Sequence, residues 1–329
     1  MNGIGKTVYQ SLIIKIIERS IMEDTYQFRF KGDDFENLYR IEGTLTTKSP
    51  VHIGTGETRP DLETWKTQRD KGEIAEDEKP HEIGEIERDY QGMPILPGSA
   101  LRGVARHYLL SLFRSFNDGK IASDPDYEDP QFKSMNQAQQ KEYMYSASLL
   151  EQLFGTPFCE SKIEFWDAPL IRKAEGNRYA TKGWDAERQT YMVRSVAIDP
   201  VTGAAERNKL YSFDVTPPGL EFRLNIVGRN LSEPELGMLL FGVEGFNSPI
   251  YPLTIGAMAG RGFGQMSFKL ENIYRLKKED LSKWMDLAIN TDSAGYILLS
   301  GLKLPDTEAG ELIRIFKSKF NELLGEKKK

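Results

Sequence analysis

The glycine-rich stretch near the C-terminal end of the chain combines residue types that suit phosphate binding. It reads Gly256-Ala-Met-Ala-Gly-Arg-Gly-Phe-Gly-Gln265 and contains four glycines, one arginine and one phenylalanine. Glycine lets the backbone approach a partner closely and point amide groups at phosphate oxygens. Arg261 adds a positive charge, and the Phe263 ring offers a surface on which a base can stack. The alternative for an isolated glycine cluster is a tight turn between two strands.

A second candidate for anion binding lies at the start of an expected helix. Pro97 and Gly98 predict a turn, and Ser99 is expected to be the N-cap. Arg102 and Arg106 follow, one helical turn apart. The apolar stripe of this helix consists of Leu101, Val104, Ala105, Tyr108, Leu109 and Leu112. A helix N-terminus with free amides, a hydroxyl and two arginines attracts anions, although charges on one helix face are more often simply solvated.

The composition limits the classes of function. The chain has 329 residues, a net charge of −6 and 39% hydrophobic residues, which is enough for a sizeable core. An acidic total argues against a free-standing electrostatic nucleic-acid binder, but it allows a basic groove on an acidic body. Cys159 is the single cysteine, so neither a disulfide framework nor a cysteine-rich zinc site is expected within one chain. The histidines are His52, His81 and His107, too scattered to suggest a metal cluster.

The two features that would direct the chain to a membrane are not evident in its sequence. The N-terminal residues lack the charged and then apolar run of a signal peptide. No apolar run approaches the ~20 residues that a membrane span needs. We therefore expect a cytoplasmic protein that does not bind membranes.

Strand and helix patterns are mixed along the chain. Alternating residues predict strands over 39–48, 162–171, 191–198, 210–215, 220–227 and 265–270. Helical spacing predicts the helix after Ser99 and further helices over 137–154, 233–245 and 306–326. Several strands are joined as hairpins, with only occasional crossovers. The pattern favours an α+β fold with an antiparallel sheet.

Residues 57–89 differ from their surroundings. They contain twelve acidic residues against six lysines or arginines, and apolar residues are sparse. Loops of this length are either functional or disordered. We expect a long exposed loop inserted into the fold.

Four motifs occur in one order between about residue 40 and residue 271. They are His52-Ile-Gly54, Ile95-Leu-Pro-Gly-Ser-Ala-Leu-Arg-Gly103, Val196-Ala-Ile-Asp-Pro-Val-Thr-Gly203 leading to Leu210–Val215, and Gly260-Arg-Gly-Phe-Gly264. Each motif is weak alone, but their order is specific. The chain resembles the RAMP superfamily of CRISPR proteins. More narrowly, it is similar to the backbone subunits of type III effector complexes of the Csm/Cmr kind, with subtype III-D as one candidate.

The resemblance implies a fold and an assembly. The fold is a modified RRM-like, or ferredoxin-like, core with a protruding thumb hairpin, which here corresponds to residues 186–215. Residues 39–271 would form this domain with 57–89 as an insertion, between an N-terminal extension (1–38) and a C-terminal helical extension (272–329). Such subunits stack along a CRISPR guide RNA beside other effector subunits, and their thumbs kink the guide and the paired target RNA.

The resemblance also implies RNA-binding residues. Ser99, Arg102 and Arg106 match the guide-backbone contacts of the family, and Gly260, Arg261, Gly262 and Gly264 match its glycine-rich loop. In the thumb, the residues expected near phosphates are Arg194, Arg207 and Lys209, whereas Met192, Val196 and Ile198 are expected to wedge against bases. The alternative is an ordinary hairpin with a small hydrophobic face. Contacts to phosphate position RNA without reading its sequence, as a protein that accepts any guide requires.

Cleavage of target RNA is a separate question. Family members that cleave carry an aspartate shortly before the segment equivalent to Glu87-Arg-Asp89, a place that falls here near Ile83 and Gly84. Acids that can replace it are Asp77, Glu82, Glu85, Glu87 and Asp89, with His52 as a base or phosphate contact, or simply as a histidine bonded to backbone. Cleavage would need a divalent cation such as Mg²⁺. The departure disfavours efficient cutting; a metal-dependent endoribonuclease and a scaffold without nucleic acid remain the alternatives.

Overall fold

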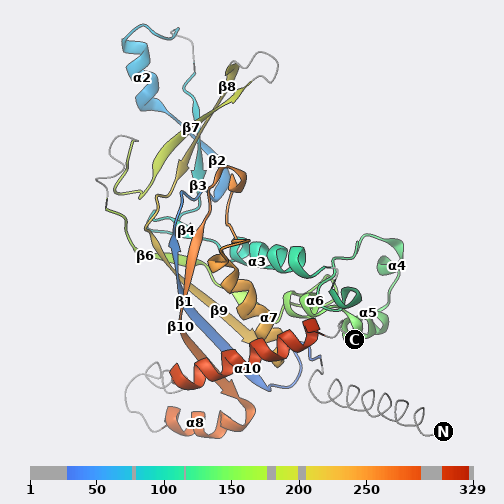
Figure 1. The fold of residues 1–329 in the computed structure, drawn as a ribbon. Helices are drawn as coiled ribbons and strands as arrows, with labels where there is room; N and C mark the ends of the chain where they lie inside the picture. The colour runs from blue at the N-terminus through green and yellow to red at the C-terminus, as the bar shows by residue number, and fades with distance from the viewer. Residues whose placement is uncertain are drawn as a thin grey trace, which may run out of the picture.

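Two β-sheets organise the chain (Figure 1). The structure is a computed structural model that describes residues 28–75, 79–114, 116–175, 183–198, 205–289 and 306–325. The larger sheet has six strands in the order β10-β1-β9-β6-β4, with β5 also paired to β9, and the smaller has four in the order β2-β3-β8-β7. We call the larger sheet and its helices the body. The expected α+β class with antiparallel sheet is confirmed.

The centre of the larger sheet is β1 (Asn37–Thr47), which lies between β9 (Glu221–Arg229) and β10 (Met266–Lys277). Both of its pairings are antiparallel. Alternate residues of β1 point into the core, and among them Ile41 and Leu45 are buried. Because successive side chains of a strand face opposite sides of a sheet, this alternation produces the strand pattern seen in the sequence.

Three short strands complete the larger sheet. They are β5 (Ile163–Phe165), β6 (Ala168–Arg172) and β4 (Ile95–Leu96). Residues 162–171, expected to form one strand, therefore form two, and Asp167 lies in the gap between them. The interruption matters at the candidate site, because it presents the Asp167 carboxylate to the start of a helix.

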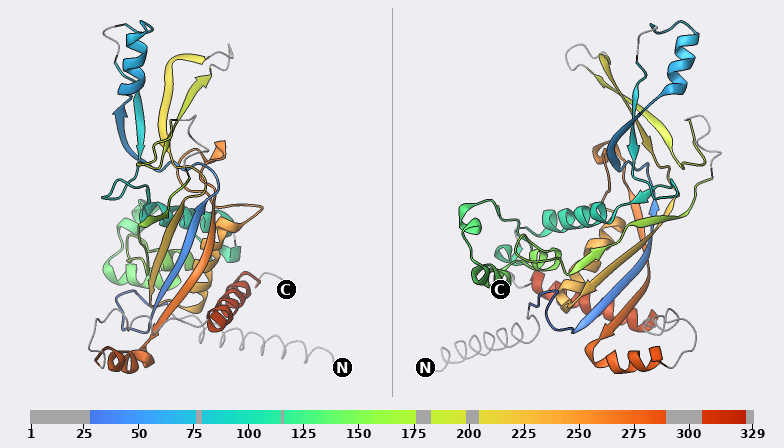
Figure 2. Two further views of the ribbon diagram at one scale, coloured as in Figure 1. Left: turned by 90° about the vertical axis from the view of Figure 1, so that its left-hand side faces the viewer. Right: turned by 180° about the vertical axis from the view of Figure 1, so that it is seen from behind.

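Four helices gather on one face of the larger sheet (Figures 1 and 2). They are α3 (Gly98–Phe113), α6 (Leu149–Phe154), α7 (Glu233–Glu244) and α10 (Asp306–Gly325). A Cβ at Gly237 of α7 would lie 2.6 Å from the carbonyl oxygen of Phe316, so the close contact between α7 and α10 requires glycine. Phe316 and Phe320 are buried, which makes α10 part of the core of the body.

Residues 137–154, expected to be one helix, form two, α5 (Gln137–Ser146) and α6. The break falls at Ala147 and Ser148. The Ser148 hydroxyl accepts the N–H of Glu151, and the Glu151 carboxylate accepts the N–H of Ser148 at 3.0 Å. This reciprocal capping box starts a new helix inside the periodic pattern, and a serine three residues before a glutamate is its sequence sign.

The smaller sheet and one helix form an arm that extends from one end of the body (Figures 1 and 2). The elements of the arm are β2 (Gly54–Pro60), α2 (Leu62–Asp70), β3 (Glu82–Ile86), β7 (Tyr191–Ile198) and β8 (Ala205–Val215). The strands β7 and β8 pair antiparallel, as the hairpin pattern of the sequence predicts. The arm therefore joins the hairpin to a second segment from much earlier in the chain.

The expectation of a loop over residues 57–89 is wrong, because much of this segment builds β2, α2 and β3, although many of its residues are exposed as expected. β3 pairs in parallel with β8, with Ile83 opposite Ser212 and Gly84 opposite Phe213. Ile83 is buried within the arm. The two strands are short and bury few apolar side chains, so the tertiary pairing, which a local pattern does not display, makes them strands.

Several short elements connect these layers. They are α4 (Pro130–Lys133), α8 (Leu281–Ile289) and the 3₁₀ turns η1 (Phe116–Gly119), η4 (Gly245–Asn247), η5 (Ala259–Arg261) and η6 (Lys278–Asp280). Within the described part of the chain, no helix has the length and apolar character needed to cross a membrane.

A buried ion pair joins the sheet to α7. The Nζ of Lys162 lies 2.7 and 2.8 Å from the carboxylate oxygens of Glu235, and both side chains are almost fully buried. Lys162 Nζ also donates to the carbonyl oxygen of Asn230 at 3.0 Å. Removing one partner of such a pair typically costs about 3–5 kcal/mol, because the other charge stays buried without compensation. The pair therefore fixes the position of α7 on the body.

Candidate nucleic-acid interface

The glycine-rich loop packs where the arm meets the body. A Cβ at Gly256 would lie 2.3 Å from the carbonyl oxygen of His52, and one at Gly264 would lie 2.2 Å from that of Ile255. Both glycines have positive φ, +85° and +79°. These two positions therefore require glycine for the packing of the loop itself. For Gly256 and Gly264, the alternative of a tight turn between two strands is therefore sufficient.

The crest of the loop is open to a partner. Gly260 and Gly262 are exposed, and a Cβ at either would meet no atom within 4 Å. Arg261 between them is also exposed, and its Nη1 lies 3.2 Å from the hydroxyl oxygen of Ser195 on β7. The N–H groups of Arg261 and Gly262 already donate to the carbonyl oxygens of Met258 and Ala259, at 2.8 and 2.9 Å. The crest thus offers one guanidinium and a glycine backbone without side chains beside the hairpin, whereas the sequence predicts free amides as well.

The ring of Phe263 has a different role from the one expected. It is half-buried and packs edge-on against Phe213 of β8, with ring centroids 6.3 Å apart. With Met258 it covers a small apolar cluster of Tyr191, Phe213 and Val215. Phe263 therefore anchors the loop to the arm and is not presented as a free stacking surface; the sequence did not reveal this because its partners lie on the hairpin.

His52 connects β1 to the arm. Its Nδ1 lies 2.7 Å from the carbonyl oxygen of Asp214, and its ring packs edge-on against Phe213 at 5.2 Å. Because a carbonyl only accepts, Nδ1 carries the proton and Nε2 is left as the acceptor of the neutral ring. Nε2 faces the backbone of Gly54, where a Cβ would lie 3.0 Å from it. A histidine bonded to the backbone is one of the sequence-based alternatives for His52, and the Nδ1 contact fits that alternative.

Three arginines and two carboxylates form a cluster at the base of the arm, which the sequence patterns did not indicate. Glu85 Oε1 lies 3.3 Å from Arg59 Nε and 2.8 Å from Arg188 Nη2. Arg59 Nη2 also donates to Asp214 Oδ1 at 3.2 Å. Arg88 completes the group, with its Nη2 3.8 Å from Asp214 Oδ2. Arg59 and Asp214 are 155 positions apart, so no local spacing signals the cluster.

The arginine cluster carries more positive than negative charge. Burial, together with the neighbouring Arg188, lowers the pKa of Arg88 despite the opposing effect of Asp214 and Glu85. The Asp214 side chain is 3% exposed and that of Arg88 14%, whereas Arg59 and Arg188 are 37% and 35% exposed. The inner members are thus compensated within the protein, and the outer arginines face solvent.

The candidate catalytic acids do not form a shared site. Glu85 is held by two arginines, as described above. Asp89 Oδ1 accepts the backbone N–H groups of Gln91 and Met93, each at 2.9 Å, and so shapes a turn. Glu82 is exposed on β3. Among the described residues, no group of three or more histidine, cysteine or acidic side chains is arranged to hold a metal ion; Asp77 lies outside them.

The start of α3 differs from the expectation for Ser99. The helix begins at Gly98, its N-cap is Pro97, and no side chain of the cap residue bonds to it. Instead, Asp167 Oδ1 accepts the Gly98 N–H at 2.7 Å. Ser99 is exposed in the first turn. Since a carboxylate already uses the positive end of the helix dipole, the amides there are less available to a phosphate than the sequence predicts.

The two arginines of α3 contact the helical part of the body. Arg102 donates to the carbonyl oxygen of Phe154 and lies over its ring, with Cζ 5.7 Å from the centroid. Arg106 Nη2 lies 2.8 Å from Asp124 Oδ1. Burial and the nearby Arg106 lower the pKa of Arg102. Both side chains remain partly exposed, so their predicted contact with RNA stays a prediction.

Arg194 of the hairpin binds α2. Its Nη2 lies 3.1 Å from Asp61 Oδ2 and 2.8 Å from the Thr64 hydroxyl. Asp61 is the N-cap of α2 and accepts the Thr64 N–H. Burial would raise the pKa of Asp61, but the bonds from Thr64 and Arg194 outweigh it and lower the pKa. The side chains of Arg207 and Lys209 lie outside the described residues.

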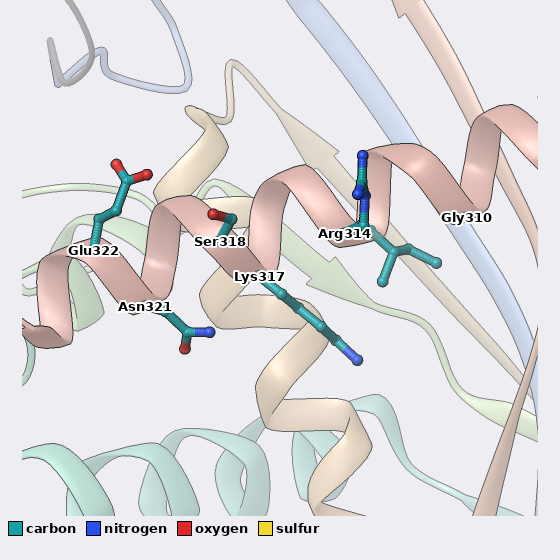
Figure 3. Close-up of a pocket in the computed structure, with 7 residues that line it drawn as sticks. Gly310, Arg314, Lys317, Ser318, Asn321 and Glu322 are labelled. Atoms are coloured by element: carbon teal, nitrogen blue, oxygen red, sulfur yellow. The ribbon is translucent and has the colours of Figure 1, made fainter.

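A separate open depression lies along α10, at a distance from the arm (Figures 1 and 3). Its lining residues are Gly310, Ile313, Arg314, Lys317, Ser318, Asn321 and Glu322, all from this one helix. None of the residues predicted from the sequence lines it. The depression is the surface of a single helix, with basic and acidic side chains side by side, and we do not assign it to the interface.

Comparison with known proteins supplies one family match. The model of the RAMP superfamily matches residues 44–267, which is more than half of the chain. The matched region begins in β1 and ends in β10, so it includes the arm, the glycine-rich loop and the arginine cluster. No curated protein matches the chain.

Proposed function

Because the chain belongs to the RAMP superfamily of CRISPR-associated RNA-binding proteins, we propose that it is a guide-RNA-binding backbone subunit of a type III effector complex. Such a complex targets RNA in antiviral defence, and the partners of this subunit would be the guide, the target RNA and other effector subunits. The observation that carries the proposal is the projecting arm with the exposed Gly260–Gly262 crest at its base.

The arrangement of the site supports binding without sequence selection. The Arg261 guanidinium would contact a phosphate, with the RNA close to the open glycine backbone of the crest, while the hairpin of β7 and β8 would act as the thumb. Residues 39–271 would form the RNA-binding domain, and α10 would belong to a C-terminal extension that packs on it. A net charge of −6 fits a subunit whose basic residues are gathered along one RNA path, leaving an acidic exterior.

The alternative function, a metal-dependent endoribonuclease, has less support. Glu85 and Asp89 are both engaged, one with arginines and the other with turn amides. The observation in its favour is His52, whose Nδ1 bond orients the ring and leaves Nε2 for a proton or phosphate contact. Cleavage would then use Mg²⁺ held by acids that the RNA brings together. We favour a subunit that positions RNA in a complex where other subunits cut.

Copurification tests the proposal directly. The chain is expressed with its neighbouring genes and a CRISPR array, and the nucleic acid bound to the purified complex is extracted and sized. RNA of a discrete guide length is expected. A purified chain without RNA or partner subunits would reject the backbone role.

The same complex separates binding from cutting. A complementary RNA is added with Mg²⁺ to complexes carrying Glu82→Gln, Glu85→Gln, Asp89→Asn or His52→Asn. Loss of one set of cleavage products in a single variant would assign cutting to this subunit and favour the endoribonuclease. An unchanged product pattern across the four variants is expected.

A further inference from the structure

We propose that the arginine cluster is a phosphodiester-binding site that Glu85 occupies in the free protein, and that a phosphate of bound RNA displaces Glu85 from Arg59 and Arg188. This inference rests on the proposed function, because RNA is the source of the phosphate. It assigns Glu85 the role of an internal substitute for the ligand, in place of the catalytic role predicted from the sequence.

The contacts of Glu85 are those of an anion in a two-arginine site. Its Oε1 accepts a hydrogen bond from Arg188 Nη2 at 2.8 Å. The same oxygen lies 3.3 Å from Arg59 Nε, an ion-pair contact without hydrogen-bond geometry, so one oxygen lies between two guanidinium groups. Guanidinium groups bind carboxylate and phosphate oxygens with the same donor geometry. A phosphodiester oxygen can therefore take the place of the carboxylate without a change in the arginines.

Accessibility allows the exchange. The side chains of Arg59, Arg188 and Glu85 are 37%, 35% and 26% exposed, so each of them reaches solvent over part of its surface. Ion pairs at such partly exposed positions are weak. Glu85 can leave by a side-chain rotation into water, since β3 keeps its backbone pairing with β2 and β8.

The inner part of the cluster keeps the arginines in place after the exchange. Asp214, 3% exposed, bonds Arg59 Nη2 through both carboxylate oxygens at 3.2 and 3.3 Å. Arg88 donates to the carbonyl oxygens of Gly92 and Arg188 at 2.9 and 2.8 Å. Without Glu85, three guanidinium groups are left with the Asp214 carboxylate, and Asp185 acts on Arg88 as a further acid. Positive charge is then in excess, which favours binding of an anion.

The cluster is continuous with the glycine-rich loop. The Asp214 carbonyl oxygen bonds His52 Nδ1 at 2.7 Å, and the His52 carbonyl oxygen accepts the Ala257 N–H at 2.8 Å. One backbone of RNA passing the Gly260–Gly262 crest would thus meet a second phosphate site at the base of the arm. This contiguity favours a nucleic-acid strand over a free small anion.

A purely structural ion-pair network makes the opposite prediction for one substitution. If Glu85 only ties β3 to its neighbours, Glu85→Gln weakens the arm and leaves RNA affinity unchanged or lower. If Glu85 competes with phosphate, Glu85→Gln removes the competitor and raises affinity. Glu82→Gln is the matched control, because it removes the same charge from an exposed position of the same strand.

The experiment measures binding of a fluorescent single-stranded RNA to the full-length chain, in its complex where the chain requires one. Glu85→Gln is expected to bind about twofold to fivefold more tightly than the wild type, the range set by weak ion pairs, and Glu82→Gln to match the wild type within about twofold. Arg59→Ala with Arg188→Ala should bind more weakly. Its slope of log affinity against log salt should be smaller by about 0.7 for each phosphate that the variant no longer binds.

The outcomes separate this inference from the proposed function. Equal affinity of Glu85→Gln and Glu82→Gln, in proteins that unfold at the same temperature as the wild type, would overturn the displacement while leaving RNA binding intact. The displacement is also overturned if Glu85→Gln still raises affinity when both outer arginines are absent, since the gain would then not arise at this site. If neither the wild type nor any variant binds RNA, both the displacement and the proposed function are rejected.

Discussion

His52 Nδ1 lies 2.7 Å from the backbone carbonyl oxygen of Asp214, and this bond joins the segment between β1 and β2 to the hairpin of the arm. The carbonyl fixes the protonated nitrogen and turns Nε2 toward Gly54. His52 thus anchors two parts of the fold through one nitrogen, and under the proposed function the other nitrogen contacts the ligand. The two functions can be separated by substitution.

We expect His52→Asn to keep the anchor and lose the interaction with the ligand. Its amide nitrogen can replace Nδ1 as the donor to Asp214, whereas nothing replaces Nε2. RNA retention should fall by about threefold to tenfold, with less than about 1 kcal/mol lost from the free energy of unfolding. His52→Phe, which loses both nitrogens, should destabilise as well. Binding titration and urea unfolding give the two readouts; retention equal to the wild type in His52→Asn would exclude a contact through Nε2.

Arg102→Ala with Arg106→Ala should weaken RNA retention and flatten its dependence on salt. The slope should fall by about 0.7 for each phosphate of single-stranded RNA that is no longer bound. Asp124→Asn is the informative companion, because it frees Arg106 from its 2.8 Å ion pair and should strengthen binding slightly. Filter binding at several salt concentrations measures both. A double variant that binds as the wild type does would remove α3 from the interface.

The sequence predicted what local periodicity determines. The apolar stripe through Leu101 and Leu109 predicted α3, and the alternation in β1 and β9 predicted the central strands. Pairings between distant segments were not visible. The strands β2 and β3 become strands because they pair with each other and with β8, and the cluster of Arg59 with Asp214 exists only after that pairing.

The same limit applies to single residues at the site. Gly260 and Gly262 keep the open environment that their motif indicates. Phe263 has the residue type suited to stacking on a base, yet it packs on Phe213. Residue type and spacing identify what a side chain is able to contact. Whether another part of the protein already contacts that group depends on the tertiary structure. The start of α3 is a second example, because Asp167 accepts the Gly98 N–H there.

Glu151 should make the stability of the protein depend on pH. Burial alone would raise its pKa, but bonds from Ser123, Tyr127, Tyr143 and Ser148 outweigh it and lower the pKa. A carboxyl with a lowered pKa stabilises the fold above its unfolded value, about 4.3 for glutamate. This contribution disappears as the pH falls through the still lower pKa of the folded state.

Glu151→Gln tests this dependence. At pH 7 it should lower the free energy of unfolding by about 1.5–3 kcal/mol, the range for hydrogen bonds to a charged group. The difference from the wild type should shrink as the pH is taken below about 4. Urea unfolding of both proteins, repeated at about every pH unit between about pH 3 and pH 7, measures this difference in the free energy of unfolding. A difference independent of pH would mean that the ionised carboxylate is not the stabilising form.

The packed glycines and the open glycines of the loop should respond differently to substitution by alanine. Gly256→Ala places a Cβ 2.3 Å from the His52 carbonyl oxygen at a φ of +85°. Strain of this kind typically costs about 1–3 kcal/mol or more, so the melting temperature should fall. Gly260→Ala places its Cβ in open space and should leave the melting temperature unchanged.

RNA binding then shows what the crest does. If Gly260 is glycine because RNA approaches its backbone, Gly260→Ala should weaken retention in a protein that is as stable as the wild type. Gly310→Ala is a suitable control, since Gly310 is exposed on α10, away from the proposed RNA path, and its Cβ would also meet no atom within 4 Å. Equal RNA affinity of the two variants, measured in one titration series, would mean that the crest makes no close backbone contact with RNA. A loss confined to Gly260→Ala cannot come from folding, and so would assign the close approach to the ligand.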